Sequence, residues 1–233
     1  MQKHQYGNTV TDDLWQAAED AGATGLVEIA HDFTKKPGVP LITVESAVCQ
    51  NGNLQVTFRQ GEFSMDRKEI TDAKPQTWSV PVIAATVGNA PVRTIIRGGK
   101  GTLSVPGCGT LIVNAGQSGY YRTLYQPGML GALTSDFGKL APIDQLGLVS
   151  DQLALSSGQS QPLAGSLDLV DAIPTDASPG VVASGVGAMT GLYGMFEDDP
   201  ARQARIAAYA SKKYGPVLDR LGFTPRAEDT APE

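Results

Sequence analysis

The side chains best suited to catalysis or metal binding are scarce in this sequence. Its 233 residues include two histidines, His4 and His31, and two cysteines, Cys49 and Cys108. A structural zinc site usually takes four Cys or His ligands, and a catalytic site usually takes three protein ligands in which His dominates. No second histidine follows His31 at the i+4 position, so we interpret both histidines as surface or hydrogen-bonded residues. We therefore assign no catalytic, metal-binding or substrate-binding residue within the chain.

The signatures of other functional classes are also missing. The sequence contains no His-Glu-x-x-His, no Gly-x-Ser-x-Gly, no phosphate-binding glycine loop and no dinucleotide fingerprint. A net charge of −6 disfavours binding to nucleic acids or anionic membranes, because both require a positive field. No apolar run approaches the ~20 residues of a membrane span, and the polar start Met1–Gly7 does not resemble a signal peptide. We expect neither a nucleic-acid partner nor a membrane span.

The two cysteines form a candidate disulfide, Cys49–Cys108. They lie at the ends of predicted strands that a β-sandwich can bring together. A bond between them would close a loop of about 60 residues and contribute about 4 kcal/mol in the chain-entropy model. The alternative is two unpaired thiols, and the residues leave both open. A disulfide would favour an exported or periplasmic location, because such bonds persist in oxidising compartments.

The composition predicts a globular protein with several parts. Hydrophobic residues make up 41% of the chain and charged residues 18%, which is too apolar for a disordered chain. The hydrophobic periodicity changes near residues 40 and 126, and the first and third segments are net negative whereas the middle one is net positive. We predict a multi-domain β + α fold with a helical segment at 1–39, a β-sandwich at 40–125 and a helical array at 126–233.

The first segment predicts two short helices. Thr11 followed by two aspartates is a helix start, with a capping oxygen and two anions at the positive end of the helix dipole. Apolar positions follow at helical spacing. A second helix is expected to begin at Thr24, and the run Pro37–Pro40 ends it because proline lacks the N–H that a helix needs.

The middle segment predicts about seven short strands. Leu41–Val48 is a β-rich apolar run, Asn51-Gly52 suits the positive φ angles of a tight hairpin, and alternating apolar residues follow on the return strand. Further strands are predicted at Thr77–Val87, Val92–Arg97, Gly101–Val105, Leu111–Asn114 and Tyr120–Tyr125. Helical connections long enough for a parallel sheet are absent, so we predict an antiparallel β-sandwich.

The third segment returns to helical spacing from Pro127 onward. Pro142, Ser178-Pro179 and Asp199-Pro200 each mark a helix start, since proline suits the first helical turn. A further helix is predicted across Leu163–Val170. Short connections between these helices predict antiparallel pairs in a solenoid-like array.

The end of the array differs from that of a complete solenoid. We expect a kink at Pro216, a helix end at Gly222 and disorder over the last ten residues. A solenoid needs a polar capping repeat at its end, and none follows Leu221. We therefore expect the chain to be a fragment of a longer protein.

Three stretches, in the same order along the chain, resemble the aminopeptidase-N-like zinc metallopeptidases. Tyr6–Trp15 and then Phe33–Val44 resemble the end of that family's catalytic domain, where a Gly-Asn…Asp-Leu-Trp helix precedes a Trp-Thr-x-Gln-x-Gly-x-Pro turn. Asn114–Tyr125 is similar to the Asn-x-x-x-x-Gly-Tyr-Tyr-Arg-Val-x-Tyr signature that closes the family's sandwich. Asp144–Asp151 resembles the opening of its C-terminal helical domain. The chain departs from the pattern with Phe33 and Lys36, where the family usually has Trp and Gln.

The resemblance implies a parent enzyme that uses zinc to remove N-terminal residues from peptides. Zinc would polarise the scissile carbonyl and activate water, with a glutamate as general base. The zinc-binding motif and the loop that holds the substrate's amino terminus would lie upstream. Residues 1–39 would then be the end of the catalytic domain, packed on a sandwich that acts as a spacer. Residues 126–233 would begin a helical lid over the active-site cavity, and the fragment itself would bind no zinc and be inactive.

An alternative is a stand-alone scaffold module that binds proteins or peptides without enzymatic activity. Tyr120, Tyr121 and Arg122 have the residue types of a binding site, but their position in a strand favours packing in the core and at a domain seam. Lys212-Lys213 is interpreted as a solvated helix face. Gly187–Thr190 matches three letters of the family's Gly-x-Met-Glu-Asn loop but lacks the Glu and the Asn, so we interpret it as coincidence.

Overall fold

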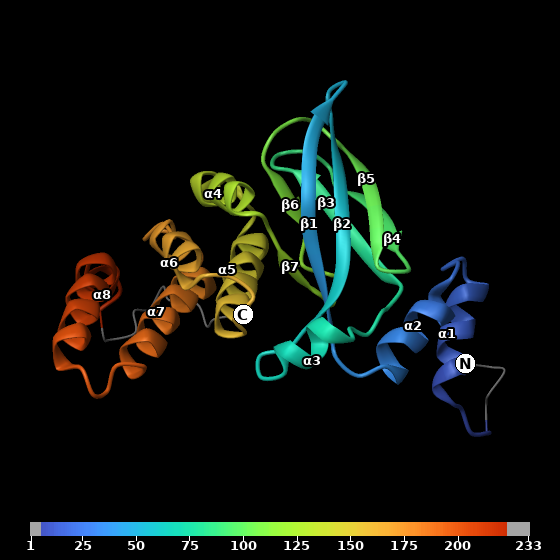
Figure 1. Ribbon diagram of the computed structural model, residues 1–233, viewed down its shortest axis with the longest axis horizontal. Helices are drawn as coiled ribbons and strands as arrows, with labels where there is room; N and C mark the ends of the chain where they lie inside the picture. The colour runs from blue at the N-terminus through green and yellow to red at the C-terminus, as the bar shows by residue number, and fades with distance from the viewer. Residues whose placement is uncertain (1–5, 223–233) are drawn as a thin grey trace.

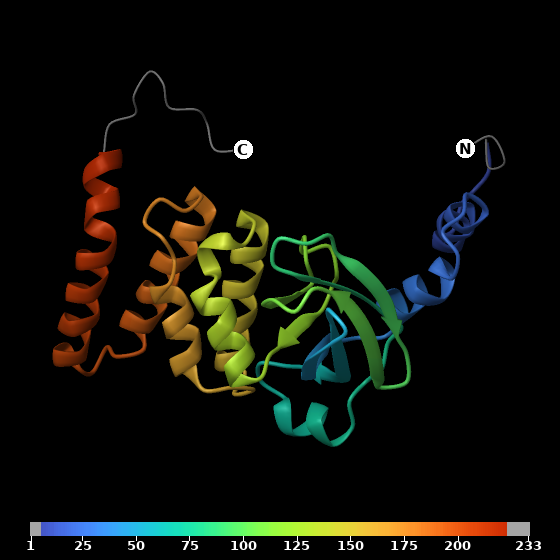
Figure 2. The ribbon, with the colours of Figure 1, turned by 90° about the horizontal axis from the view of Figure 1, so that it is seen from above.

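The computed structural model describes residues 6–222, which form three consecutive parts (Figure 1). Two short helices come first, two β-sheets follow, and a stack of helices completes the described chain. Figure 2 shows these parts in a row, with the sheets in the middle. The mixed architecture confirms the predicted β + α fold class. His4 and the predicted disorder of the last ten residues lie outside the described residues.

The N-terminal pair consists of α1 (Thr11–Asp20) and α2 (Leu26–Lys35). The prediction that Thr11 caps α1 was wrong by one position, because Val10 is the N-cap residue. The Val10 N–H donates to Asp13 Oδ2 at 2.9 Å, so a carboxylate inside the first turn satisfies the backbone at the helix start. α2 begins later than predicted, after Gly25 at a φ of 77°.

The sandwich contains a four-stranded and a three-stranded sheet, and each of the seven predicted strands is present. The first sheet has the order β5-β2-β1-β7 and the second the order β4-β3-β6. Their bounds are β1 (Val39–Gln50), β2 (Asn53–Phe63), β3 (Val80–Thr86), β4 (Val92–Ile96), β5 (Lys100–Pro106), β6 (Leu111–Val113) and β7 (Arg122–Leu124).

Two features of the sandwich differ from the prediction. β7 pairs with β1 in parallel, so the expectation of a purely antiparallel sandwich was wrong. The physical reason is that the chain crosses from the second sheet to the first after β6. It joins the first sheet as an edge strand next to β1 and runs in the direction of β1. A short helix, α3 (Lys68–Ala73), also interrupts the connection between β2 and β3. The β1–β2 hairpin turns at Asn51 and Gly52, whose φ angles of 50° and 78° are those the sequence suggested.

The helical array begins directly after β7. It consists of α4 (Pro127–Ser135), a 3₁₀ turn (Phe137–Lys139), α5 (Pro142–Ser157), α6 (Leu163–Asp171), α7 (Pro179–Gly194) and α8 (Pro200–Leu221). Proline occupies the first turn of α4, α5, α7 and α8, where its fixed φ favours a helix start. α8 continues through Pro216 and ends at Gly222, which has a φ of 72°. In Figures 1 and 2, α8 lies farthest from the sandwich.

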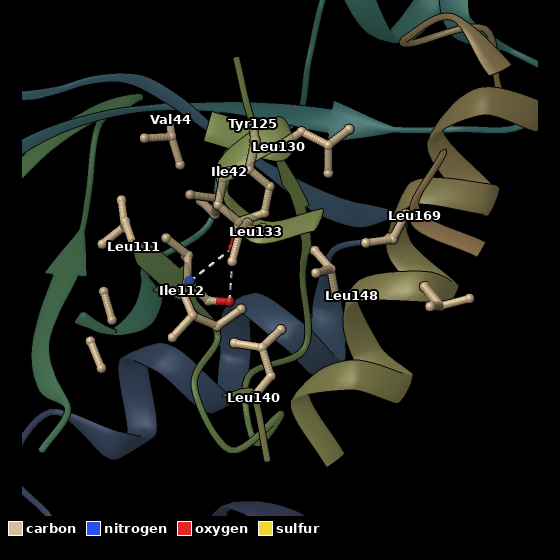
Figure 3. Close-up of a cluster of buried hydrophobic side chains, with 14 of the residues drawn as sticks. Ile42, Val44, Leu111, Ile112, Tyr125, Leu130, Leu133, Leu140, Leu148 and Leu169 are labelled. Atoms are coloured by element: carbon tan, nitrogen blue, oxygen red, sulfur yellow. Dashed lines mark hydrogen bonds between the residues drawn. The ribbon is translucent and has the colours of Figure 1, made fainter. Parts of the chain in front are cut away.

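One hydrophobic cluster extends from the sandwich into the array. Phe58 and Ile96 of the sandwich and Leu133 of α4 all belong to it and are completely buried. Figure 3 shows the region where the two parts meet, with Ile42 of β1 and Leu148 of α5 in the same cluster. Because buried side chains of both parts belong to this one cluster, the sandwich and the first helices share a core.

Two glycines of α7 have opposite surroundings and give a matched stability prediction. A Cβ at Gly185 would lie 2.2 Å from Tyr214 Oη and 3.0 Å from Ile173 Cδ1, whereas nothing lies within 4 Å of one at Gly187. Gly185→Ala should lower the free energy of unfolding by about 1 kcal/mol, because displacing α8 costs more than helix propensity gains. Gly187→Ala should raise it by about 0.5–1 kcal/mol. Urea unfolding measures both changes, and shifts in the same direction would contradict the close α7–α8 contact.

Candidate functional site

The described residues do not present a set of ligands that fits zinc. No group of three or more His, Cys, Asp or Glu side chains that could hold a metal ion occurs among residues 6–222. His31 Nε2 lies 2.7 Å from Asp12 Oδ1, which connects α2 to α1. This hydrogen bond is the main cause that lowers the pKa of Asp12. His31 is therefore engaged in a surface pair between two helices.

Polar contacts instead concentrate where the sandwich meets α5. The loop between β6 and β7 is closed by Asn114, whose side chain accepts from the Gly119 N–H at 2.8 Å and donates to the Gly119 carbonyl at 3.0 Å. Asp144, in the first turn of α5, accepts from the Gly116 N–H at 2.7 Å. α5 approaches this loop so closely that a Cβ at Gly147 would overlap the Gln117 side chain. The loop that carries the chain into β7 is thus fixed on α5.

The free edge of β7 is capped by two consecutive residues of α5. β7 has β1 as its neighbour on one side, and its other edge would leave backbone groups without partners. Asp151 Oδ2 accepts from the Thr123 N–H at 3.0 Å, and Gln152 Nε2 donates to the Thr123 carbonyl at 3.1 Å. Asp151 Oδ1 also accepts from Arg122 Nη1 at 2.7 Å. We call these four residues, Arg122, Thr123, Asp151 and Gln152, the edge clamp.

The Asp151 carboxylate is buried, with its side chain 12% exposed. Burial raises the pKa of Asp151, and the hydrogen bonds from Arg122 and the Thr123 N–H, with the positive charge of Arg122, offset part of that rise. The ionised carboxylate therefore depends on its two partners. Gln152 is completely buried and Thr123 is 1% exposed, so the contacts to the Thr123 backbone lie inside the protein.

The Tyr120–Arg122 segment has a different role at each residue. Tyr121 is buried, and its Oη accepts from the Ile83 N–H of β3 at 3.3 Å. Burial is the main cause that raises the pKa of Tyr121, and Arg122 reaches α5 at the seam. Tyr120 is 66% exposed, so of the two expected places, the core and a domain seam, it lies at the seam. It lies beside α2, where its ring meets that of Phe33 edge to face at 6.1 Å between centroids.

Carboxylates of α2 attach the N-terminal pair to the sandwich. Asp32 Oδ2 accepts from the Ser79 N–H at 2.6 Å, and Glu28 Oε1 accepts from Ser79 Oγ at 3.1 Å. Lys36 Nζ lies 2.6 Å from Asp32 Oδ1 and donates to the Thr77 carbonyl at 2.8 Å. Lys36, which departs from the family pattern, thus bridges α2 and the segment that leads into β3.

These contacts predict a pH-dependent contribution of Asp32 to stability. Partial burial opposes ionisation, but the hydrogen bonds from Lys36 and Ser79 outweigh it and lower the pKa of Asp32. A carboxyl group whose pKa is lowered by folding stabilises the folded state at pH values above its unfolded pKa of roughly 3.9. This stabilisation is lost as the pH falls through the folded pKa. The difference in free energy of unfolding between the unmodified chain and Asp32→Asn should therefore shrink below about pH 4. A difference of equal size at pH 7 and pH 3 in urea unfolding would contradict this.

Two further sequence interpretations have different outcomes. Lys212 is exposed, but the solvated face predicted for Lys213 was wrong, because its side chain is 13% exposed. Lys213 donates to the Asp171 carbonyl of α6, and Tyr209 donates to the carboxylate of the same residue. Gly187–Thr190 lies within α7, away from any loop.

A disulfide joins Cys49 of β1 to Cys108, just after β5, with 5.3 Å between their Cα atoms. Of the two alternatives that the residues left open, the structure contains the bonded one. β2 lies between β1 and β5 in the sheet, and the Gly107 N–H donates to the Gly52 carbonyl at 2.9 Å. The disulfide therefore spans the tip of the sandwich over the hairpin turn.

Thr123 and Gln152 were not identified from the sequence. The available signal was the adjacent polar pair Asp151-Gln152 at buried positions of α5, between the buried apolar residues Leu148 and Leu155. Buried polar side chains require hydrogen-bond partners, so such a pair indicates a contact with another element.

Among the described helices, none has the length and apolar character needed to cross a membrane.

Comparison with known proteins places this arrangement in a family. Residues 110–233 match the family described as the ERAP1-like C-terminal domain. Aminopeptidase 2 of Candida albicans is 29% identical over 237 residues, which cover 99% of this chain and 25% of that protein. Puromycin-sensitive aminopeptidase of Caenorhabditis elegans is 30% identical over 165 residues, which cover 66% of this chain and 17% of that protein. Glutamyl aminopeptidase of Mus musculus is 25% identical over 235 residues, which cover 96% of this chain and 24% of that protein.

The family match begins at the last strands of the sandwich and covers more than half of the chain. Aminopeptidase 2 and glutamyl aminopeptidase extend the likeness over nearly all of it, and the chain spans about a quarter or less of the length of the three relatives. The chain therefore belongs to the aminopeptidase-N-like family, in the region that contains the ERAP1-like C-terminal domain.

Proposed function

We propose that this chain is a non-catalytic region of a zinc-dependent aminopeptidase that removes N-terminal residues from peptides. The observation that carries the proposal is the family match over residues 110–233, together with relatives that are named aminopeptidases and matched over nearly the whole chain. The described residues support a non-catalytic role, since their His, Cys, Asp and Glu side chains form no cluster suited to zinc. Zinc held elsewhere in the longer enzyme would polarise the scissile carbonyl and activate water.

The three parts receive separate roles in this proposal. Residues 1–39 are the end of a catalytic domain, 40–125 a spacer, and 126–233 the start of a helical lid over the active-site cavity. The contacts of Asp32 and Lys36 support a firm attachment of the first part to the spacer. The edge clamp and the shared hydrophobic cluster support a fixed angle between the spacer and the lid. A lid on a rigid spacer keeps its position over a site that it does not itself form.

The disulfide supports a proposal about location. Structural disulfides form and persist mainly in oxidising environments such as the periplasm or the cell exterior. Because Cys49 and Cys108 are bonded, we propose that the enzyme is exported. Equal amounts of this bond in protein recovered from a reducing and from an oxidising compartment would contradict the proposal.

The spacer-and-lid role can be tested in the longer enzyme by weakening the edge clamp. Asp151→Asn places an amide where the carboxylate accepts two hydrogen bonds. The kcat/KM for a hexapeptide should fall by about tenfold, because small misplacements of positioning elements are costly. The kcat/KM for leucine 4-nitroanilide, which is too short to reach a lid, should stay unchanged.

A matched control is Asp176→Asn, which removes an exposed carboxylate between α6 and α7. It should alter neither rate. An equal loss for both substrates with Asp151→Asn, or no loss for either, would contradict the lid role.

A further inference from the structure

The turn between β1 and β2 consists of two exposed residues, Asn51 and Gly52. It projects from one end of the sandwich (Figure 1). Nothing lies within 4 Å of the place where a Cβ of Gly52 would be, so the space beside the peptide bond that joins the two residues is open. Water can therefore reach both the side-chain amide of Asn51 and the backbone nitrogen of Gly52.

The hydrogen bonds of this turn leave those two groups unused. The Asn51 carbonyl accepts from Asn53 Nδ2 at 3.2 Å, and the Gly52 carbonyl accepts from the Gly107 N–H at 2.9 Å. Within residues 6–222, the Asn51 side chain and the Gly52 N–H have no hydrogen-bond partner. A side-chain amide thus lies next to a backbone nitrogen that no hydrogen bond holds in place.

The other asparagines of the chain lack this combination. Three of them donate side-chain hydrogen bonds to neighbouring residues, namely Asn53, Asn89 and Asn114. Asn8 is exposed, but the residue after it is threonine, whose branched Cβ crowds the backbone. Only Asn51 is followed by glycine, which has no Cβ and permits close approach to its backbone nitrogen. Asn51 is therefore the asparagine most open to attack by the next residue.

We propose that Asn51-Gly52 is a site of spontaneous modification, at which the asparagine converts to isoaspartate and aspartate. The Gly52 nitrogen attacks the side-chain carbonyl carbon of Asn51 and forms a new C–N bond, and the bond from that carbon to Nδ2 breaks. The amide proton of Gly52 leaves with Nδ2 as ammonia, and a succinimide ring remains. Water then opens the ring at either carbonyl, which gives aspartate in one case and isoaspartate in the other.

Isoaspartate would change the shape of the turn as well as its charge. Its main chain runs through the former side chain, which adds a methylene group to the backbone and leaves a carboxylate on the surface. A two-residue turn matches the twist of its strands only with particular backbone angles, here φ angles of 50° at Asn51 and 78° at Gly52. The longer backbone does not fit these angles, so the Gly107–Gly52 hydrogen bond should weaken.

The test is a peptide map of the whole chain after incubation in mildly alkaline buffer that contains water labelled with heavy oxygen. Conversion at residue 51 should precede conversion at the other asparagines, and each product should carry an oxygen atom from water. Endoproteinase Asp-N distinguishes the products, because it cleaves before aspartate but not before isoaspartate. Faster conversion at any other asparagine, aspartate without isoaspartate, or no conversion at residue 51 would overturn the proposal.

Asn51→Gln is the matched variant, because it keeps an amide but moves it one carbon farther from the Gly52 nitrogen. Glutamine occupies the left-handed region elsewhere in this chain, at Gln117 and Gln159 with φ angles of 52° and 56°, so the turn should persist. The variant should form no isoaspartate. Incubation should lower the urea midpoint of the unmodified chain and leave that of the variant constant. An unchanged midpoint in an unmodified chain that contains isoaspartate would overturn the effect on the turn.

Discussion

Replacing both cysteines, with Cys49→Ser and Cys108→Ser together, should lower the free energy of unfolding by about 4 kcal/mol. The bond joins residues separated by 59 positions, so its loss frees a loop of about 60 residues in the unfolded chain. The folded sandwich changes little, because the Leu54–Val105 pairing of β2 with β5 and the Gly107–Gly52 hydrogen bond hold the tip. The effect thus acts mainly through the unfolded state.

Urea unfolding with and without reductant provides an internal control. Cys49 and Cys108 are both exposed, so a small thiol can reach the bond. Reductant should lower the urea midpoint of the unmodified chain toward that of the double variant and leave the double variant unchanged. A loss under about 1 kcal/mol on removing the bond would contradict the loop-closure argument.

Asp151→Ala should lower the free energy of unfolding by about 2–3 kcal/mol, the second large effect. It leaves the Thr123 N–H without an acceptor in a buried place, which costs about 1–3 kcal/mol, and it opens a small void. The loss of the Arg122 partner adds little, because that side chain is 31% exposed and can be hydrated. Burial raises the pKa of Asp151, so the buried negative charge is itself unfavourable. Its removal offsets part of the loss in free energy of unfolding.

Asp176→Ala is the matched control for this variant. It removes an exposed carboxylate and should change the free energy of unfolding by less than about 0.5 kcal/mol. A double-mutant cycle with Arg122→Ala should show a coupling energy between Arg122 and Asp151 of about 0.5–1 kcal/mol. Equal effects of the Asp151 and Asp176 variants would mean that the edge clamp contributes nothing to stability.

The elements that the sequence identified correctly are those fixed by local pattern. The β1–β2 hairpin follows from alternating apolar residues around Asn51-Gly52, because few residues other than Gly and Asn adopt the positive φ that such a turn requires. The starts of α7 and α8 follow from Ser178-Pro179 and Asp199-Pro200 for a similarly local reason. Such signals need no knowledge of what the element packs against.

The features that the sequence missed depend on distant partners. The direction of β7 relative to β1 cannot be read from three residues, since side-chain alternation is the same in parallel and antiparallel strands. The contacts of the clamp join Thr123 to residues 28 and 29 positions later. Lys213 was misassigned for the same reason, because its partner Asp171 lies on another helix.

If these residues are a non-catalytic region of a zinc aminopeptidase, as we propose, the purified chain should be inactive on its own. The chain should be incubated with zinc and leucine 4-nitroanilide, with bound zinc measured in the same sample. We expect no release of 4-nitroaniline above the buffer rate and no stoichiometric zinc binding. Zinc-dependent release that a chelator stops and that His31→Ala abolishes would contradict the proposal, because the catalytic centre would then lie within this chain.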